Sequence, residues 1–107
     1  MPSAPDQKTL RSIAHTLQPI VTVADKGLNE NIEQEIERAL RQHELIKIKI
    51  FAADRSARQA MIEDICAQRE AKLVQRIGNV AVLYRASRKP DPRLSNILRN
   101  KKARASN

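Results

Sequence analysis

The chain of 107 residues has few aromatic residues, few glycines and a single cysteine. One cysteine excludes an internal disulfide framework and a cysteine-rich zinc site. The only aromatic side chains are Phe51 and Tyr84, which argues against a sheet that stacks RNA bases on aromatic rings. No apolar run approaches the roughly 20 residues of a membrane span, and the N-terminus has no apolar stretch of signal-peptide type. We therefore expect a cytoplasmic protein with no membrane partner.

The sequence is rich in positive charge, and this charge is concentrated near the C-terminus. The net charge is +8, of which residues 85–107 contribute +7 and residues 1–84 only +1. The C-terminal cations are Arg85, Arg88, Lys89, Arg93, Arg99, Lys101, Lys102 and Arg104. Such a basic segment favours a polyanionic partner, with nucleic acid ahead of membrane, although a tail that only increases solubility is the alternative.

Apolar periodicity predicts a single α/β domain with element order α-β-α-β-α-β-β and a four-stranded mixed sheet. The expected helices span about 7–16, 29–42 and 55–70, and the expected strands span 20–23, 45–51, 72–77 and 80–85. Asn29 and Asp54 are suited to cap the second and third helices. The first strand is β-branched throughout and is expected to be buried, while Gly78-Asn79 between two apolar runs predicts a hairpin.

Three regions are expected along the chain. Residues 1–6 carry two prolines and form a disordered lead-in, and residues 7–89 form the domain. Residues 90–107 are polar and basic without a sustained apolar pattern, so we expect a disordered tail that buries little.

Gly27 lies between the first strand and the second helix, with Lys26 beside it. The simpler interpretation is a turn that needs a positive φ, which glycine adopts at little cost. The alternative is a phosphate cradle, because a glycine loop at a helix N-terminus presents backbone N–H groups in a positive field. Glu30 and Glu33 count against the cradle, since they already occupy the positive end of the helix.

Four stretches resemble a known family in order and spacing: LRSIAHTLQPIVTVADKGLNENIEQEIERAL, HELIKIKI, DRSARQAMIEDI and VQRIGNVAVLYR. Together they cover about residues 8–89. They resemble the CRM-domain family (chloroplast RNA splicing and ribosome maturation), in particular its small free-standing bacterial YhbY-like members.

The resemblance implies a fold similar to the C-terminal domain of translation initiation factor three. It also implies RNA binding and association with precursors of the large ribosomal subunit. The loop after the first strand is implied to be an RNA-contacting loop of GxxG type, here Ala24, Asp25, Lys26 and Gly27. The sequence departs from the pattern at Ala24, where the family usually has glycine, and Asp25 adds a negative charge to the loop.

Further basic side chains are candidates for RNA contact. Lys47 and Lys49 share one face of the second strand, which is either solvated or faces RNA. Arg55 and Arg58 lie one turn apart on the third helix and are either solvated or contact phosphates. Arg85, Arg88 and Lys89 connect the last strand to the tail, which supplies Arg93, Arg99, Lys101, Lys102 and Arg104.

No catalytic arrangement is evident. Nothing in the sequence places a nucleophile or paired carboxylates beside His15 or His43, the only histidines. We expect a non-enzymatic, monomeric RNA-binding protein that needs no cofactor or metal and assists assembly of the large ribosomal subunit. The alternative is a protein-interaction module whose basic tail docks on an acidic protein partner.

Overall fold

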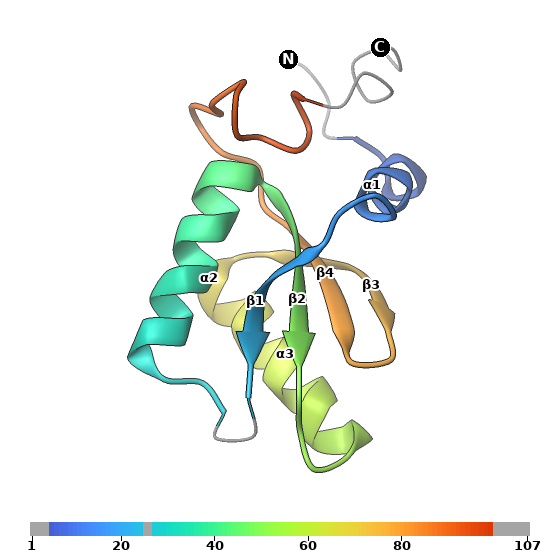
Figure 1. The fold of residues 1–107 in the computed structure, drawn as a ribbon, viewed down its shortest axis with the longest axis vertical. Coiled ribbons are helices and arrows are strands. Elements are labelled where there is room, and N and C mark those ends of the chain that lie inside the picture. Colours follow the sequence, from blue (N-terminus) through green and yellow to red (C-terminus); the bar gives the residue numbers. More distant parts are fainter. Residues whose placement is uncertain (1–4, 25–26, 100–107) are drawn as a thin grey trace.

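The computed structural model describes residues 5–24 and 27–99. The helices are α1 (Gln7–Ala14), α2 (Glu30–His43) and α3 (Arg55–Arg69), and the strands are β1 (Pro19–Val23), β2 (Leu45–Ile50), β3 (Lys72–Ile77) and β4 (Val80–Tyr84). Their order along the chain is the expected one, and the four strands form one mixed sheet (Figure 1).

The strand order in the sheet is β1-β2-β4-β3. β1 and β2 are parallel, as expected for two strands connected through a helix, and β3 and β4 pair as an antiparallel hairpin. The hairpin turn is Gly78-Asn79, with Ile77 opposite Val80 and Gly78 at φ 58°. β4 lies between β2 and β3, so the two edges of the sheet are β1 and β3.

One face of the sheet is covered by α2 and α3. The residues that share this main core are all apolar and buried: Val21, Val23, Ile36, Ala39, Leu40, Ile46, Ile48, Ile50, Ile62, Ile65, Ala81 and Leu83. The isoleucines of β2 alternate with lysines, so the period of two assigns them to one face. Burying this apolar area is the main stabilising contribution to the fold.

The other face is covered only in part, by α1 near one end of the strands (Figure 1). Leu10, Ile13 and Ala14 of α1 are buried in a second cluster with Leu45, Val74 and Val82 of the strands. The clean helical spacing of the three α1 residues explains why this short helix was evident in the sequence.

The helices begin at the caps that the sequence predicts. Asn29 Oδ1 accepts a hydrogen bond from the N–H of Ile32 (2.9 Å), and Asp54 Oδ1 accepts one from the N–H of Ala57 (2.8 Å). The ends of α2 and α3 are less usual, because Glu44 and Glu70 follow them with positive φ angles of 61° and 53°. A residue with a Cβ is strained in this region, where glycine is preferred.

The expected disordered tail is wrong for residues 91–99, which pack on the domain. Ser95 is completely buried, and Ile97 packs against the α1 cluster. The side chain of Asn96 donates to the carbonyl of Leu45 (2.7 Å), and its N–H donates to the carbonyl of His43 (3.0 Å). The segment has no apolar period because turns and polar contacts hold it instead of a helix.

Glu44 holds this C-terminal segment in place. Its Oε1 accepts a hydrogen bond from the hydroxyl of Ser95 (2.6 Å), and its Oε2 accepts one from the N–H of Ser87 (2.7 Å). Glu44 is itself buried, so both carboxylate oxygens have partners within the protein. These bonds explain how a glutamate is retained at a strained backbone position.

Two smaller expectations also need correction. The lead-in is not disordered up to residue 6, because Asp6 Oδ1 caps α1 through the N–H of Thr9 (2.8 Å); residues 1–4 lie outside the described part. β1 is not buried throughout, since Ile20 is 49% exposed at an edge of the sheet. Within residues 5–24 and 27–99, no helix is long and apolar enough to cross a membrane.

Candidate nucleic-acid interface

The loop between β1 and α2 begins at Ala24 and contains a tight turn. The N–H of Gly27 donates to the carbonyl of Ala24 (2.8 Å), and Gly27 has a φ of 82°. Among the described residues, apart from its chain neighbours, a Cβ at Gly27 would meet nothing within 4 Å, so the backbone conformation and not crowding favours glycine. This confirms the predicted turn and leaves open space beside it that a ligand can approach.

The loop leads directly into the N-terminus of α2. Glu30 and Glu33 lie in the first turn of that helix, as the sequence indicates. Asp25 and Lys26, the central residues of the predicted RNA-contacting loop, lie outside the described residues. The predicted role of all four loop residues as RNA contacts stays a prediction.

The two lysines of β2 lie on the sheet face that carries α1. Lys47 is opposite Val82 of the α1 cluster, and its Nζ donates to the carbonyl of Leu17 (3.1 Å). Lys49 is half-buried, and its Nζ lies 5.4 Å from the centroid of the Phe51 ring. Neither lysine forms an ion pair with a described carboxylate, so both keep a positive charge available to an anion.

The two arginines at the start of α3 differ in their surroundings. Arg55 is exposed, whereas Arg58 is half-buried and its Nε is buried without a hydrogen-bond partner in the described part of the chain. Nη1 of Arg76 on β3 is likewise buried without a hydrogen-bond partner in the described part of the chain, and no sequence pattern indicated a role for this arginine. Burial of such groups is known only once the tertiary structure is known.

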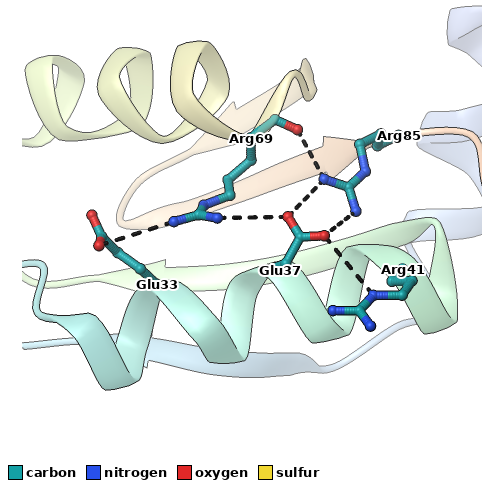
Figure 2. Close-up of polar contacts among 5 residues, drawn as sticks. All are labelled: Glu33, Glu37, Arg41, Arg69 and Arg85. Carbon is teal, nitrogen blue, oxygen red and sulfur yellow. Dashed lines mark hydrogen bonds and ion pairs between the residues drawn. The ribbon is translucent and has the colours of Figure 1, made fainter.

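Arg85 has structural partners within the protein, and its predicted contact with RNA stays a prediction. Its guanidinium binds the carboxylate of Glu37 on α2 with two hydrogen bonds of 2.7 and 2.9 Å and donates to the carbonyl of Arg69 (3.0 Å) (Figure 2). The guanidinium of Arg69 lies between Glu33 and Glu37, and Arg41 forms an i,i+4 pair with Glu37 (3.9 Å). This network connects α2, α3 and the end of β4.

The network shifts the pKa values of its members. The hydrogen bond from Arg85 has the largest effect and lowers the pKa of Glu37. Burial opposes it, and the charges of Arg85, Arg69 and Arg41 lower the pKa further. The same bond raises the pKa of Arg85. Both groups are therefore charged at neutral pH and committed to each other.

The remaining candidates lie after β4. Arg88 and Lys89 are exposed, and Arg93 is exposed beside Asp91, with 3.6 Å between Arg93 Nε and Asp91 Oδ1. Arg99 is also exposed. It lines a pocket of about 180 Å³, which is also lined by Leu17, Gln18, Ile20, His43, Ile46, Lys47 and Asn96. Lys101, Lys102 and Arg104 lie outside the described residues.

Several candidates meet at one end of the sheet. The N–H of Phe51 donates to the carbonyl of Val23 (2.8 Å), so Phe51 is adjacent to the residue at which the Gly27 loop begins. The N–H of Ile50 donates to the carbonyl of Asn79 (2.7 Å), which places the hairpin turn at the same end. Figure 1 shows the β1–α2 and β2–α3 connections together at this end, on the opposite side of the molecule from residues 91–99.

Comparison with known proteins gives a consistent result. Residues 4–85 match the CRS1 / YhbY (CRM) domain. A Pseudomonas aeruginosa protein named "probable RNA-binding protein" is 47% identical over 93 residues, which cover 87% of this chain and 89% of the relative. A Haemophilus influenzae protein named "RNA-binding protein" is 44% identical over 85 residues, covering 79% of this chain and 86% of the relative.

The structural comparison agrees with the sequence comparison. The solution structure of a hypothetical protein from Staphylococcus aureus matches with a TM-score of 0.69 and 32% sequence identity, covering 78% of this chain and 86% of that one. The fold is thus that of a small α/β domain with three helices and a four-stranded mixed sheet. The chain belongs to the CRS1 / YhbY (CRM) domain family.

Proposed function

We propose that this chain is a non-enzymatic RNA-binding protein that associates with precursors of the large ribosomal subunit and assists their assembly. It acts in the cytoplasm as a monomer and needs no cofactor. RNA is held mainly through its phosphates, by the Gly27 loop, by Lys47 and Lys49, and by the cations after β4.

The observation that carries the proposal is the position of the Gly27 loop near Lys49, a cation without an ion pair among the described residues. Lys49 has no described acidic partner, and Phe51 beside it is hydrogen-bonded to the strand that leads into the loop. A positive charge next to an open glycine turn suits a phosphate group. The names of the relatives support RNA as the polyanion, and the family resemblance supports the ribosomal precursor.

The structure also reduces the number of cations that are free to contact RNA. Arg85, Arg69 and Arg41 neutralise Glu33 and Glu37, so they are poor candidates for phosphate contact. Among the predicted contact residues, Lys49 lies at the Gly27 end of the sheet, and Arg88, Lys89, Arg93 and Arg99 lie along the C-terminal segment. RNA contacts at two separate places would orient the domain on its target more firmly than one contact.

The alternative is a protein-interaction module that docks its basic tail on an acidic protein. The exposed Arg88 and Lys89 are compatible with both functions, because exposed cations attract any polyanion. A sedimentation experiment in cell extract separates the two hypotheses. The full-length chain should sediment with precursors of the large subunit at low salt and should be released by added salt and by nuclease. Sedimentation that persists after nuclease treatment would favour the protein partner.

A further inference from the structure

The face of the sheet that carries α1 is open at the end near the Gly27 loop. Across the four strands, Thr22, Lys49, Val80 and Ile77 form one row, as the strand register shows. Thr22 is exposed and Ile77 is 63% exposed, whereas Val82, which lies opposite Lys47, is buried under α1. α1 thus covers one end of this face and leaves the other end accessible (Figure 1).

The open end combines apolar surface with positive charge and has no acidic residue in any of its strands. The sequences of the four strands contain no Asp or Glu. The large exposed hydrophobic residues of the described chain are Ile20, Phe51 and Ile77. Apolar and cationic strands without carboxylates suit a ligand that has flat apolar groups joined by anionic ones. Unpaired RNA has this composition.

Phe51 is the aromatic residue of this surface. It continues the period-two pattern of Lys47 and Lys49, it is 41% exposed, and the Lys49 ammonium lies over its ring. The backbone bond to Val23 fixes it immediately beside the Gly27 loop. An exposed ring with a cation beside it can receive a base and the adjoining phosphate together.

We infer that Phe51 is a base-stacking residue: one unpaired RNA base stacks on its ring while Lys49 contacts the adjoining phosphate. The inference rests on the proposed function and adds to it the site at which an unpaired nucleotide is held. It also revises the expectation from composition, which argued against stacking because aromatic residues are rare. A single ring in the right place is sufficient for one base.

The chain has no tryptophan, and this allows a direct test. The full-length Phe51→Trp variant carries a single tryptophan at the proposed site. It is titrated with short oligouridylate RNA and with an abasic RNA of the same length and charge. Stacking predicts strong quenching of the tryptophan emission by oligouridylate and little quenching by the abasic RNA at equal occupancy, measured by anisotropy of labelled RNA.

Matched variants distinguish the contribution of the aromatic ring to binding from that of apolar area alone. Phe51→Tyr retains the ring and should bind oligouridylate within about 2-fold of wild type. Phe51→Leu retains apolar area without a ring and should weaken binding between about 5-fold and about 150-fold, the range for loss of one stacked base. Affinity for the abasic RNA should be equal in all three proteins. Because residue 51 is exposed, the melting temperatures should remain close, and each is measured alongside.

The outcomes distinguish this inference from the proposed function. If oligouridylate binds but does not quench the tryptophan, or if Phe51→Leu binds like wild type, Phe51 does not stack a base and RNA binding itself stands. If Ile77→Ala weakens binding as much as Phe51→Leu, the surface is a general apolar patch and the stacking assignment is wrong. If neither oligouridylate nor structured precursor RNA binds the wild-type chain at low salt, both conclusions are wrong.

Discussion

Replacing Ser95 with alanine should destabilise the domain by about 2 kcal/mol. The Ser95 hydroxyl makes a 2.6 Å hydrogen bond to the buried carboxylate of Glu44, and bonds to charged groups contribute about 1.5–3 kcal/mol. The change removes this donor and leaves one buried carboxylate oxygen without a partner. An unfolding entropy of about 2.1 cal/mol/K per residue converts 2 kcal/mol into a melting temperature lower by about 9 °C.

Ser87 provides the matched control. It also donates to Glu44, but through its backbone N–H (2.7 Å), which alanine keeps. Ser87→Ala should therefore remain within about 0.5 kcal/mol of wild type. The assay is thermal and urea unfolding of both variants, followed by circular dichroism. Equal stability of Ser95→Ala and Ser87→Ala would refute the packing of residues 91–99 on Glu44.

The packing of residues 91–99 also predicts that truncation of the C-terminal segment lowers the stability of the domain. A tail that buried nothing could be removed after residue 89 without effect on folding. In the structure, truncation there removes Ser95, the Asn96 contacts with β2 and α2, and the Ile97 side chain from the α1 cluster. Truncation after residue 89 should cost at least as much stability as Ser95→Ala.

Three further predictions follow from the loop, the ion-pair network and the lysines. Gly27→Val should cost about 1–3 kcal/mol through backbone strain, and Gly27→Asn less, because asparagine tolerates positive φ; urea unfolding compares them. Glu37→Gln should lower the stability by about 1–3 kcal/mol near neutral pH. Because the folded-state pKa of Glu37 is lowered from 4.5, its ionised carboxylate contributes full stability above pH 4.5 and loses it as the pH falls through the lowered pKa, so the difference between Glu37→Gln and wild type should shrink there. A pH series of melting curves measures this. The double change Lys47→Ala and Lys49→Ala should weaken RNA binding at low salt. It should also reduce the slope of log affinity against log salt by about 0.7–0.9 for each phosphate contact that is lost. A binding titration that matches wild type would show that neither lysine contacts RNA.

The sequence predicted those parts of the fold that depend on local patterns. The period-two isoleucines of β2, the caps Asn29 and Asp54, and the Gly78-Asn79 turn each depend on a few neighbouring residues, and each lies where expected. Gly27 also belongs here, since a lone glycine before a capped helix indicates a positive φ without knowledge of the rest of the chain.

The sequence did not show contacts between residues that are distant from each other along the chain. Glu37 and Arg85 are separated by 48 positions, and no local pattern indicates that the arginine is neutralised. Ser95 binds Glu44 from 51 positions away, so a segment without apolar period appears free in the sequence. The exposure of Phe51 also depends on a distant part of the chain. The period-two pattern of β2 shows that Phe51 shares a face with Lys49, but this end of the face is open only because α1 is too short to cover it.

The most direct test of the central claim is equilibrium binding of the full-length chain to a structured precursor fragment of large-subunit ribosomal RNA, compared with an unrelated RNA of equal length, over a salt series. The account predicts tight binding at low salt, a log affinity that falls linearly with log salt as counterions are released, and a preference for the precursor that persists along the series. No binding to either RNA at low salt, or an affinity that does not change with salt, would contradict it.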